Sequence, residues 1–293
     1  SPEAYEQAVC IYVSEDGGRF RVNVFRKETG VGATFRFIPG NIPTLDSLAL
    51  PPVLRKLLEH HQGMILVTGS TGTGKSTTLA AMIDHLNSNQ NCNIISLEDP
   101  IEFIHRSKQA QIIQRELGTH LPSFAEGIRA ALREDPDVIL VGELRDADTI
   151  QMAMTAAETG HLVLGTLHTT GAVKTIDRVI DALPGDMREQ TKSFLAQSLN
   201  AVISQNLVRT PDGRGRKAIV EIMIMTRAIA KPITTDQTHQ TPAHLHAAKA
   251  PGLRTIDQAL MPATQQKQTH PDAMALRGLS ARAAGRSLDV QYY

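Results

Sequence analysis

Residues 64–83 read MILVTGSTGTGKSTTLAAMI, and this stretch decides the fold of the chain around it. The apolar run at 64–67 predicts a buried parallel strand, and residues 76–83 predict a helix. Between them, residues 69–77 match the complete GxxxxGK(S/T) pattern of a phosphate-binding loop. A glycine-rich strand-to-helix turn without a ligand is the alternative, but the complete pattern in this context favours a nucleotide site.

In such a loop, several backbone N–H groups point at one anion, and the helix N-terminus adds the positive end of its dipole. Lys75 is expected to neutralise the β- and γ-phosphates, and the Ser76 hydroxyl is expected to hold Mg²⁺. The expected nucleotide ligands of the loop are Gly69, Ser70, Thr71, Gly72, Thr73, Gly74, Lys75, Ser76 and Thr77. The sequence therefore predicts that ATP binds here with Mg²⁺.

The composition describes a globular chain with room for one sizeable core and a smaller domain, since 41% of its 293 residues are hydrophobic and 20% are charged. Thirty basic and thirty acidic residues give a formal net charge of zero, which argues against general electrostatic capture of nucleic acid. Two cysteines provide neither a disulfide framework nor a cysteine-rich zinc site, so a reduced cytoplasmic setting is expected.

No uninterrupted apolar stretch reaches the length of a transmembrane helix, so any membrane association is expected to run through partners. The N-terminal residues show no basic region followed by an apolar signal core. The chain starts at Ser1 without an initiator Met, so the sequence leaves open whether the native N-terminus is missing.

Apolar strands and helices alternate from residue 63 onward, which predicts an α/β fold with a mostly parallel sheet flanked by helices. The predicted strands are residues 64–68, 93–97, 138–141 and 162–166. Helices are predicted at 45–58, 123–133 (opened by a capping box), 146–159 (closed by Gly160) and 187–208. Alternating residues at 20–25 and 34–38 predict two strands of a small β-rich domain before this core.

Two carboxylates follow predicted strands, Glu98 after 93–97 and Glu143 after 138–141. Ligands bind at the carboxyl ends of strands in such sheets, so both are expected beside the phosphate loop. One carboxylate would hold Mg²⁺, a role we assign to Glu143 together with Ser76, and one would orient or deprotonate the attacking water. Helix capping or a surface ion pair is the alternative role for either residue.

His161 and His168 flank the predicted strand at 162–166. An imidazole near the nucleotide could sense the γ-phosphate by exchanging hydrogen-bond partners after hydrolysis. A hydrogen-bonded packing role is the alternative, and spacing alone does not decide between the two.

Four long motifs resemble the bacterial secretion ATPases, and within them the PilT-like type IV pilus retraction ATPases. They are the phosphate loop, LEDPIEF at 97–103, ALREDPDVILVGE at 131–143, and TAAETGH at 155–161 with LHTT at 167–170. In the terms of that family these are the Walker A, Asp box, Walker B and His box, in the family's order. The resemblance covers roughly residues 17–227.

The resemblance implies a homo-hexameric ring with a RecA-like core and an N-terminal PAS-like domain. It implies that ATP hydrolysed at subunit interfaces drives domain rotation, pilus retraction and twitching motility. The ring would be cytoplasmic, at the inner face of the membrane, on an inner-membrane pilus platform protein, with a paralogous retraction ATPase as a further partner. Direct nucleic-acid binding and a transmembrane segment are not implied.

The same resemblance directs attention to Arg21 and Arg36 in the N-terminal strands, where an arginine would reach a neighbour's γ-phosphate. Without the family, alternating arginines would be the solvated face of a strand. The domain division implied is a partial PAS-like domain at 1–38, a linker at 39–45, a RecA-like core at 46–230 and a divergent C-terminal region at 231–293 that is partly disordered or helical.

The C-terminal region departs from the family, whose Ala-Ile-Arg-Asn-Leu-Ile segment is replaced here from Ala228 onward. Pro232 and two later prolines are expected to interrupt helices. His244 and His246 are expected to be solvent-exposed and not a metal site. Three functions therefore stay open: a pilus retraction motor or related secretion ATPase, an accessory retraction paralogue with weak motor activity, and a nucleic-acid translocase. Zero net charge and the His box count against the translocase.

Overall fold

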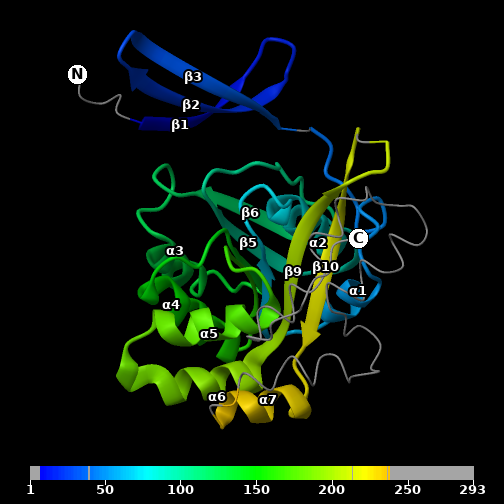
Figure 1. Ribbon diagram of the computed structural model, residues 1–293, viewed down its shortest axis with the longest axis vertical. Coiled ribbons are helices and arrows are strands. Elements are labelled where there is room, and N and C mark those ends of the chain that lie inside the picture. Colours follow the sequence, from blue (N-terminus) through cyan, green and yellow to red (C-terminus); the bar gives the residue numbers. More distant parts are fainter. Residues whose placement is uncertain (1–6, 39, 213, 236, 238–293) are drawn as a thin grey trace, which may run out of the picture.

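The computed structural model describes residues 7–38, 40–212, 214–235 and 237, which form a small sheet and a larger helix-covered sheet (Figure 1). The prediction for His244 and His246 lies outside the described residues. Within the described part of the chain, no helix is both long enough and apolar enough to cross a membrane.

The large sheet has seven strands in the order β10-β9-β4-β8-β7-β5-β6. All neighbouring strands are parallel except the edge pair β9 and β10, which is antiparallel. The strands are β4 (Gly63–Thr68), β5 (Asn93–Glu98), β6 (Gln111–Glu116), β7 (Val138–Val141), β8 (Leu162–Leu167), β9 (Leu199–Arg209) and β10 (Arg216–Ile224). The predicted α/β class and the four predicted strands are confirmed, and β4 lies between β8 and β9 in the sheet.

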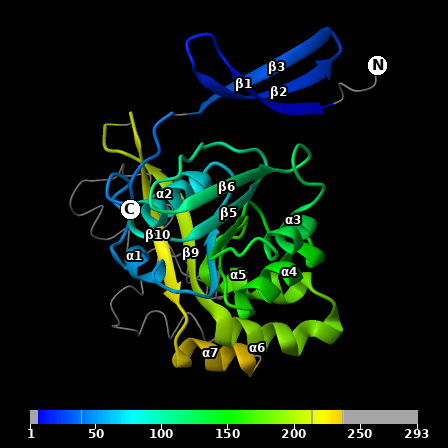
Figure 2. The ribbon, with the colours of Figure 1, turned by 180° about the vertical axis from the view of Figure 1, so that it is seen from behind.

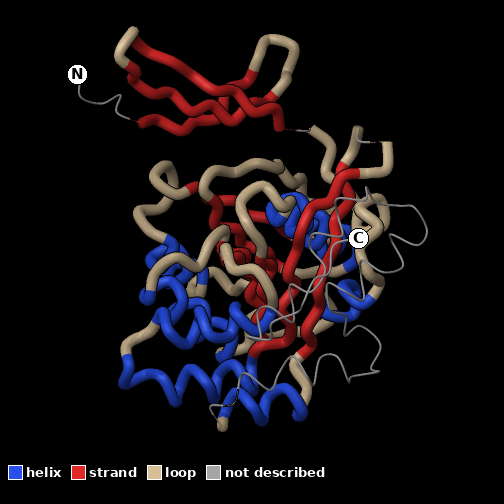
Figure 3. The backbone as a smooth tube through the Cα atoms, in the orientation of Figure 1, coloured by secondary structure: helices blue, strands red, loops and turns tan. Residues whose placement is uncertain are grey.

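Helices cover both faces of this sheet (Figure 3). Successive strand residues point to opposite faces, so Met64 and Leu66 pack toward α3 to α7, whereas Ile65 and Val67 pack toward α1 and α2. The helices are α1 (Val53–Leu57), α2 (Lys75–Asn89), α3 (Phe124–Ala131), α4 (Ala147–Glu158), α5 (Ala172–Ala182), α6 (Arg188–Ser198) and α7 (Arg227–Thr234), with the 3₁₀ turn η2 (Gly185–Met187) before α6. Each fully buried aliphatic side chain in these two layers contributes about 1.5–3 kcal/mol.

Two predicted helix starts and one predicted end are confirmed by their caps. The Ser123 hydroxyl accepts the Glu126 N–H at 3.2 Å, and the Asp146 carboxylate accepts the Thr149 N–H at 2.8 Å. After α4, Gly160 has φ of +97°, a left-handed conformation that glycine adopts at little cost. These caps set the directions in which α3 and α4 leave the loops beside the site.

Three helix predictions were wrong. The predicted helix at 45–58 is limited to α1, because consecutive prolines precede it and residues 45–49 form turns. Residues 187–208 divide into α6 and β9, because β9 is buried on both faces and its apolar run is indistinguishable from a buried helix by periodicity. Pro232 does not interrupt a helix but lies buried inside α7, where Ile229 and Ile233 hold the helix against the core.

The small sheet comprises β1 (Gln7–Val13), β2 (Arg19–Lys27) and β3 (Gly30–Ile38), all antiparallel. Both views place it beyond the end of the large sheet nearest β5 and β6 (Figure 2). Arg19 donates to the backbone carbonyls of Ile101 and Glu102 in the loop after β5, at 3.1 Å for Ile101. Arg21 and Arg36 are register partners on β2 and β3, so the two guanidinium groups leave the same face of the sheet.

Candidate active site

The phosphate loop connects β4 to α2 and has the backbone conformation that its glycines permit. Gly69, Gly72 and Gly74 have φ of +146°, +80° and +86°. A Cβ on Gly69 would lie 2.3 Å from the carbonyl oxygen of Gln205, so no other residue fits there. The predicted strand, loop and helix are confirmed, and the loop is packed directly against β9.

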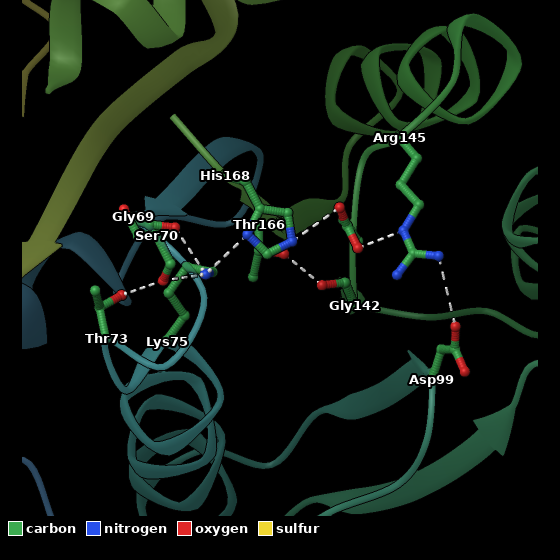
Figure 4. A network of polar contacts seen from close by, with 10 residues as sticks. Gly69, Ser70, Thr73, Lys75, Asp99, Gly142, Arg145, Thr166 and His168 are labelled. Atoms are coloured by element: carbon green, nitrogen blue, oxygen red, sulfur yellow. Dashed lines mark hydrogen bonds and ion pairs between the residues drawn. The ribbon is translucent and has the colours of Figure 1, made fainter. Parts of the chain in front are cut away.

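Lys75 extends from the first turn of α2 into the loop, where it is 8% exposed (Figure 4). Its Nζ donates to the carbonyls of Gly69 at 2.8 Å and Ser70 at 3.1 Å, and it lies 3.2 Å from Nδ1 of His168. Burial lowers the pKa of the Lys75 ammonium, and the charge of Glu143 partly opposes this shift. The loop thus holds a desolvated cation where phosphate groups would bind.

His168 connects this cation to Glu143. An ammonium can only donate, so Nδ1 of His168 accepts from Lys75 and Nε2 carries the ring proton of the neutral imidazole. Nε2 then donates to Oε1 of Glu143 at 3.0 Å. The predicted approach of His168 and Glu143 to the phosphate loop agrees with this geometry.

Glu143 continues the chain of polar contacts toward β5. Its second carboxylate oxygen accepts from Nε of Arg145, and Arg145 lies 3.8 Å from Asp99. Arg145 and Asp99 were missed by the sequence reasoning, although each lies within two residues of a predicted carboxylate. Their side chains are more than a third exposed, so they form the solvent-facing end of the network.

Glu98 belongs to a separate set of contacts at the end of β5. One of its oxygens accepts from the Ser96 hydroxyl and from Nε2 of Gln114, the latter at 2.9 Å. Burial raises the pKa of Glu98, and the two hydrogen bonds from Ser96 and Gln114 oppose this shift. The fold therefore disfavours the ionised form of Glu98 relative to a carboxyl group in water.

Glu98→Gln is expected to raise the melting temperature by a few degrees at pH 8 and by less at pH 5. With its pKa raised in the fold, Glu98 binds more protons in the native than in the unfolded state as pH rises above the ordinary carboxyl range, so wild-type stability falls there. Glutamine keeps the acceptor oxygen but cannot ionise. Thermal unfolding of both proteins at each pH measures the difference, and an equal shift at both values would contradict the assignment.

A cavity of about 300 Å³ brings most of the predicted residues together. Its lining includes Lys75 and Ser76 from the loop, together with Glu98, Glu143 and His168. Thr71, Gly72, Gly74 and Thr77 complete the loop's share of the lining. The cavity is therefore bounded by the Lys75 cation on the loop side and by carboxylates on the strand side.

Arg21 and Arg36 line the same cavity from the small sheet, and Arg21 forms a 3.4 Å ion pair with Glu102. Both residues therefore line the cavity of their own chain, and an arginine that reaches a neighbour's γ-phosphate stays a prediction.

His161 is not brought to this cavity. It precedes β8, at the opposite end of that strand from His168, and its Nδ1 lies 2.9 Å from the carbonyl oxygen of Ala156 at the end of α4. Within one chain this is a hydrogen-bonded packing position, and a nucleotide role for His161 stays a prediction.

Comparison with known proteins assigns this arrangement to a family. The model of the type II/IV secretion system protein family matches residues 49–273, more than half of the chain. The chain belongs to the type II/IV secretion system protein family. A twitching motility protein of Neisseria gonorrhoeae is 50% identical over 265 residues, which cover 90% of this chain and 71% of that protein.

Two further relatives support the same membership. The type IV pilus retraction ATPase PilT of Pseudomonas aeruginosa is 49% identical over 242 residues, covering 83% of this chain and 70% of PilT. A crystal structure of the pilus retraction motor PilT with bound ADP has a TM-score of 0.85 and 41% identity, covering 93% of this chain and 78% of that one. The resemblance to PilT-like secretion ATPases is confirmed.

The residues of this secretion-family chain fit Mg²⁺ only together with phosphates. In the described part of the chain, no group of three or more His, Cys, Asp or Glu side chains could hold a metal by itself. Mg²⁺ normally takes one or two protein carboxylates plus substrate phosphates and water. Ser76 and Glu143 both line the cavity and are the residues that would hold the ion.

Proposed function

We propose that the chain is the ATP-hydrolysing motor subunit of a type IV pilus system and drives pilus retraction. The observation that carries the proposal is the contact chain from Lys75 through His168 to Glu143 inside the cavity of the phosphate loop. A cation for phosphates and a carboxylate for water, linked by one imidazole, are the parts that phosphoryl transfer to water requires. We assign this ATP hydrolysis to pilus retraction because the similar proteins are a twitching motility protein and a pilus retraction ATPase.

In the proposed reaction, Lys75 exchanges the Gly69 and Ser70 carbonyls for the β- and γ-phosphates of ATP. Mg²⁺, held near Ser76 and Glu143, would neutralise phosphate charge. A water attacks the γ-phosphorus while the bond to the β–γ bridging oxygen breaks, and the water's proton passes to Glu143. ADP and inorganic phosphate are the products. Glu98, the second carboxylate that lines the cavity, would help to orient the attacking water.

His168 has a sensing role in this proposal. Its Nδ1 accepts from Lys75 at 3.2 Å, and this bond is lost when Lys75 turns to phosphate. The imidazole then changes partners, and its contact with Glu143 at 3.0 Å passes the change to the carboxylate. After phosphate leaves, the original bonds can form again.

Arg21 and Arg36 are proposed to add positive charge to the phosphates from the small sheet of the same chain. Binding or release of the phosphates would then move the small sheet relative to the core. We infer a homo-hexamer in the cytoplasm, peripheral to the inner membrane through a pilus platform protein. We also propose an N-terminal domain up to residue 38, a linker at 39–45, a core at 46–230 and a separate C-terminal region. The helix α7 crosses the boundary at residue 230.

Mg²⁺-dependent ATP turnover by the purified chain, measured over a wide range of protein concentration, tests this proposal. Turnover per subunit is expected to rise with concentration and to reach a plateau as rings assemble. The same chain is expected to restore twitching to a bacterium that lacks its own retraction ATPase. ATP binding without turnover at any concentration would overturn the motor and favour an accessory subunit.

A further inference from the structure

Gln205 of β9 holds the phosphate loop and the first turn of α2 through two buried hydrogen bonds. Its Oε1 accepts from the Thr78 hydroxyl at 2.7 Å, and its Nε2 donates to the carbonyl of Thr73 at 2.7 Å. Gln205 is 2% exposed, so water does not compete for either bond. A Cβ added to Gly74 would lie only 2.9 Å from the Gln205 Nε2, so the backbone of the loop packs directly against this side chain.

Ser204, the preceding residue, points to the other face of the sheet, because neighbouring strand residues alternate. Its hydroxyl accepts the N–H of Gly171 at 2.8 Å. Glu221, the register partner of Ser204 on β10, accepts the N–H of Ala172 at 2.8 Å. Gly171 and Ala172 begin α5, three and four residues after His168. The β9–β10 pair therefore holds the loop of His168 as well as the loop of Lys75.

We propose that Gln205 and Ser204 are positioning residues that set the spacing between Lys75 and His168. These two side chains come from loops after different strands, β4 and β8, and their 3.2 Å contact requires both loops to be held in place relative to each other. The strand β9 bonds to both loops, to one loop on each face of the sheet, and so fixes their positions relative to each other. The roles of Lys75 and His168 rest on the proposed function.

The hydrogen bonds, and not packing alone, carry this role. Losing the Gln205 amide leaves the Thr78 hydroxyl and the Thr73 carbonyl buried without a partner, which is unfavourable because neither group can bond to water instead. The Thr73 carbonyl can then relax only by moving the loop. We expect the loss to appear in nucleotide affinity, because the loop's N–H groups lose their common direction.

The test compares Gln205→Met and Gln205→Glu with the wild-type protein. Methionine keeps the size and loses both bonds, whereas glutamate keeps the acceptor for Thr78 and loses the donor to Thr73. Calorimetric binding of Mg²⁺-ADP is expected to weaken about tenfold or more in both variants. Gln197→Met on the exposed side of α6 is the matched control and is expected to bind as the wild type does.

Thr78→Val provides a milder arm if the Gln205 variants fold poorly, since it removes only the hydroxyl. Combined with Gln205→Met, it is expected to weaken ADP binding less than the two single effects together, because both remove the same bond. Wild-type ADP affinity in folded Gln205→Met, with only a lower melting temperature, would overturn the proposal. Because ADP binding is the readout, this result does not depend on whether the chain hydrolyses ATP.

Ser204→Ala separates the two faces of the strand. It frees the Gly171 N–H and is expected to lower kcat for ATP several-fold, with less change in ADP affinity than Gln205→Met, because His168 and not the loop is displaced. If Ser204→Ala and Gln205→Met changed kcat and ADP affinity in the same proportion, separate positioning of the two loops would be contradicted.

Discussion

Lys75→Ala is expected to abolish tight nucleotide binding, with a loss of affinity for Mg²⁺-ATP of at least about 100-fold. The buried ammonium is the cation of the loop that touches the Gly69 and Ser70 carbonyls, and it is in place to meet two phosphates. Hydrogen bonds to charged groups contribute about 1.5–3 kcal/mol each, and 1.4 kcal/mol is tenfold in affinity. Calorimetric titration with ATP and ADP measures the loss.

The fold of the Lys75→Ala protein is expected to survive, because burial already lowers the pKa of the ammonium and its removal relieves a desolvated charge. An unchanged melting temperature therefore separates lost binding from lost structure. Lys56→Ala on the exposed side of α1 is the matched control and is expected to bind ATP normally. Wild-type affinity in the Lys75→Ala protein would exclude this loop as the phosphate site.

Glu143→Gln is expected to keep ATP affinity within a few-fold while turnover falls about 10²–10⁴-fold, the range that general base catalysis contributes. The amide oxygen can still accept from Nε2 of His168, so the contact chain from Lys75 persists. It cannot take a proton from water. Steady-state turnover and ATP binding, measured on the same preparation, give both quantities.

Two comparisons make the Glu143 result specific. Glu126→Gln on α3 removes an exposed carboxylate that is also paired with an arginine, and turnover is expected to be unchanged. Arg145→Ala breaks the ion pair with Glu143 without altering the carboxylate. If Arg145→Ala reduced turnover as strongly as Glu143→Gln, the ion pair and not proton transfer would explain the effect. Full turnover by the Glu143→Gln protein would remove that residue from the mechanism.

Strands that are short, apolar and bounded by turn residues were predictable from local pattern, as β4, β5, β7 and β8 demonstrate. The strands β1, β6 and β10 were not predicted, and β9 was predicted as a helix. Residues of β9 are buried on both faces, so its apolar run lacks the two-residue alternation that would indicate a strand. Its partner β4 lies more than a hundred residues earlier in the chain, and only that pairing selects the strand.

The candidate site divides in the same way. Residues 69–77, Glu98 and Glu143 could be predicted because each follows a strand, and parallel strands end at a common edge. Gln205 was missed because its role lies in bonds to Thr73 and Thr78, more than 120 residues away, and no local motif encodes such a contact. A buried polar residue inside an apolar run was the available signal.

The sequence by itself determined the parallel α/β class, the phosphate loop and the identity of its cation and carboxylates. These features depend on local chemistry, namely hydrophobic period, glycine φ angles and charge at strand ends. Only the tertiary structure decided that His168 joins Lys75 to Glu143, that His161 lies apart, and that both arginines line the cavity of their own chain. Those outcomes depend on strand order and on the placement of the small sheet, which are set by long-range packing that no short stretch of sequence records.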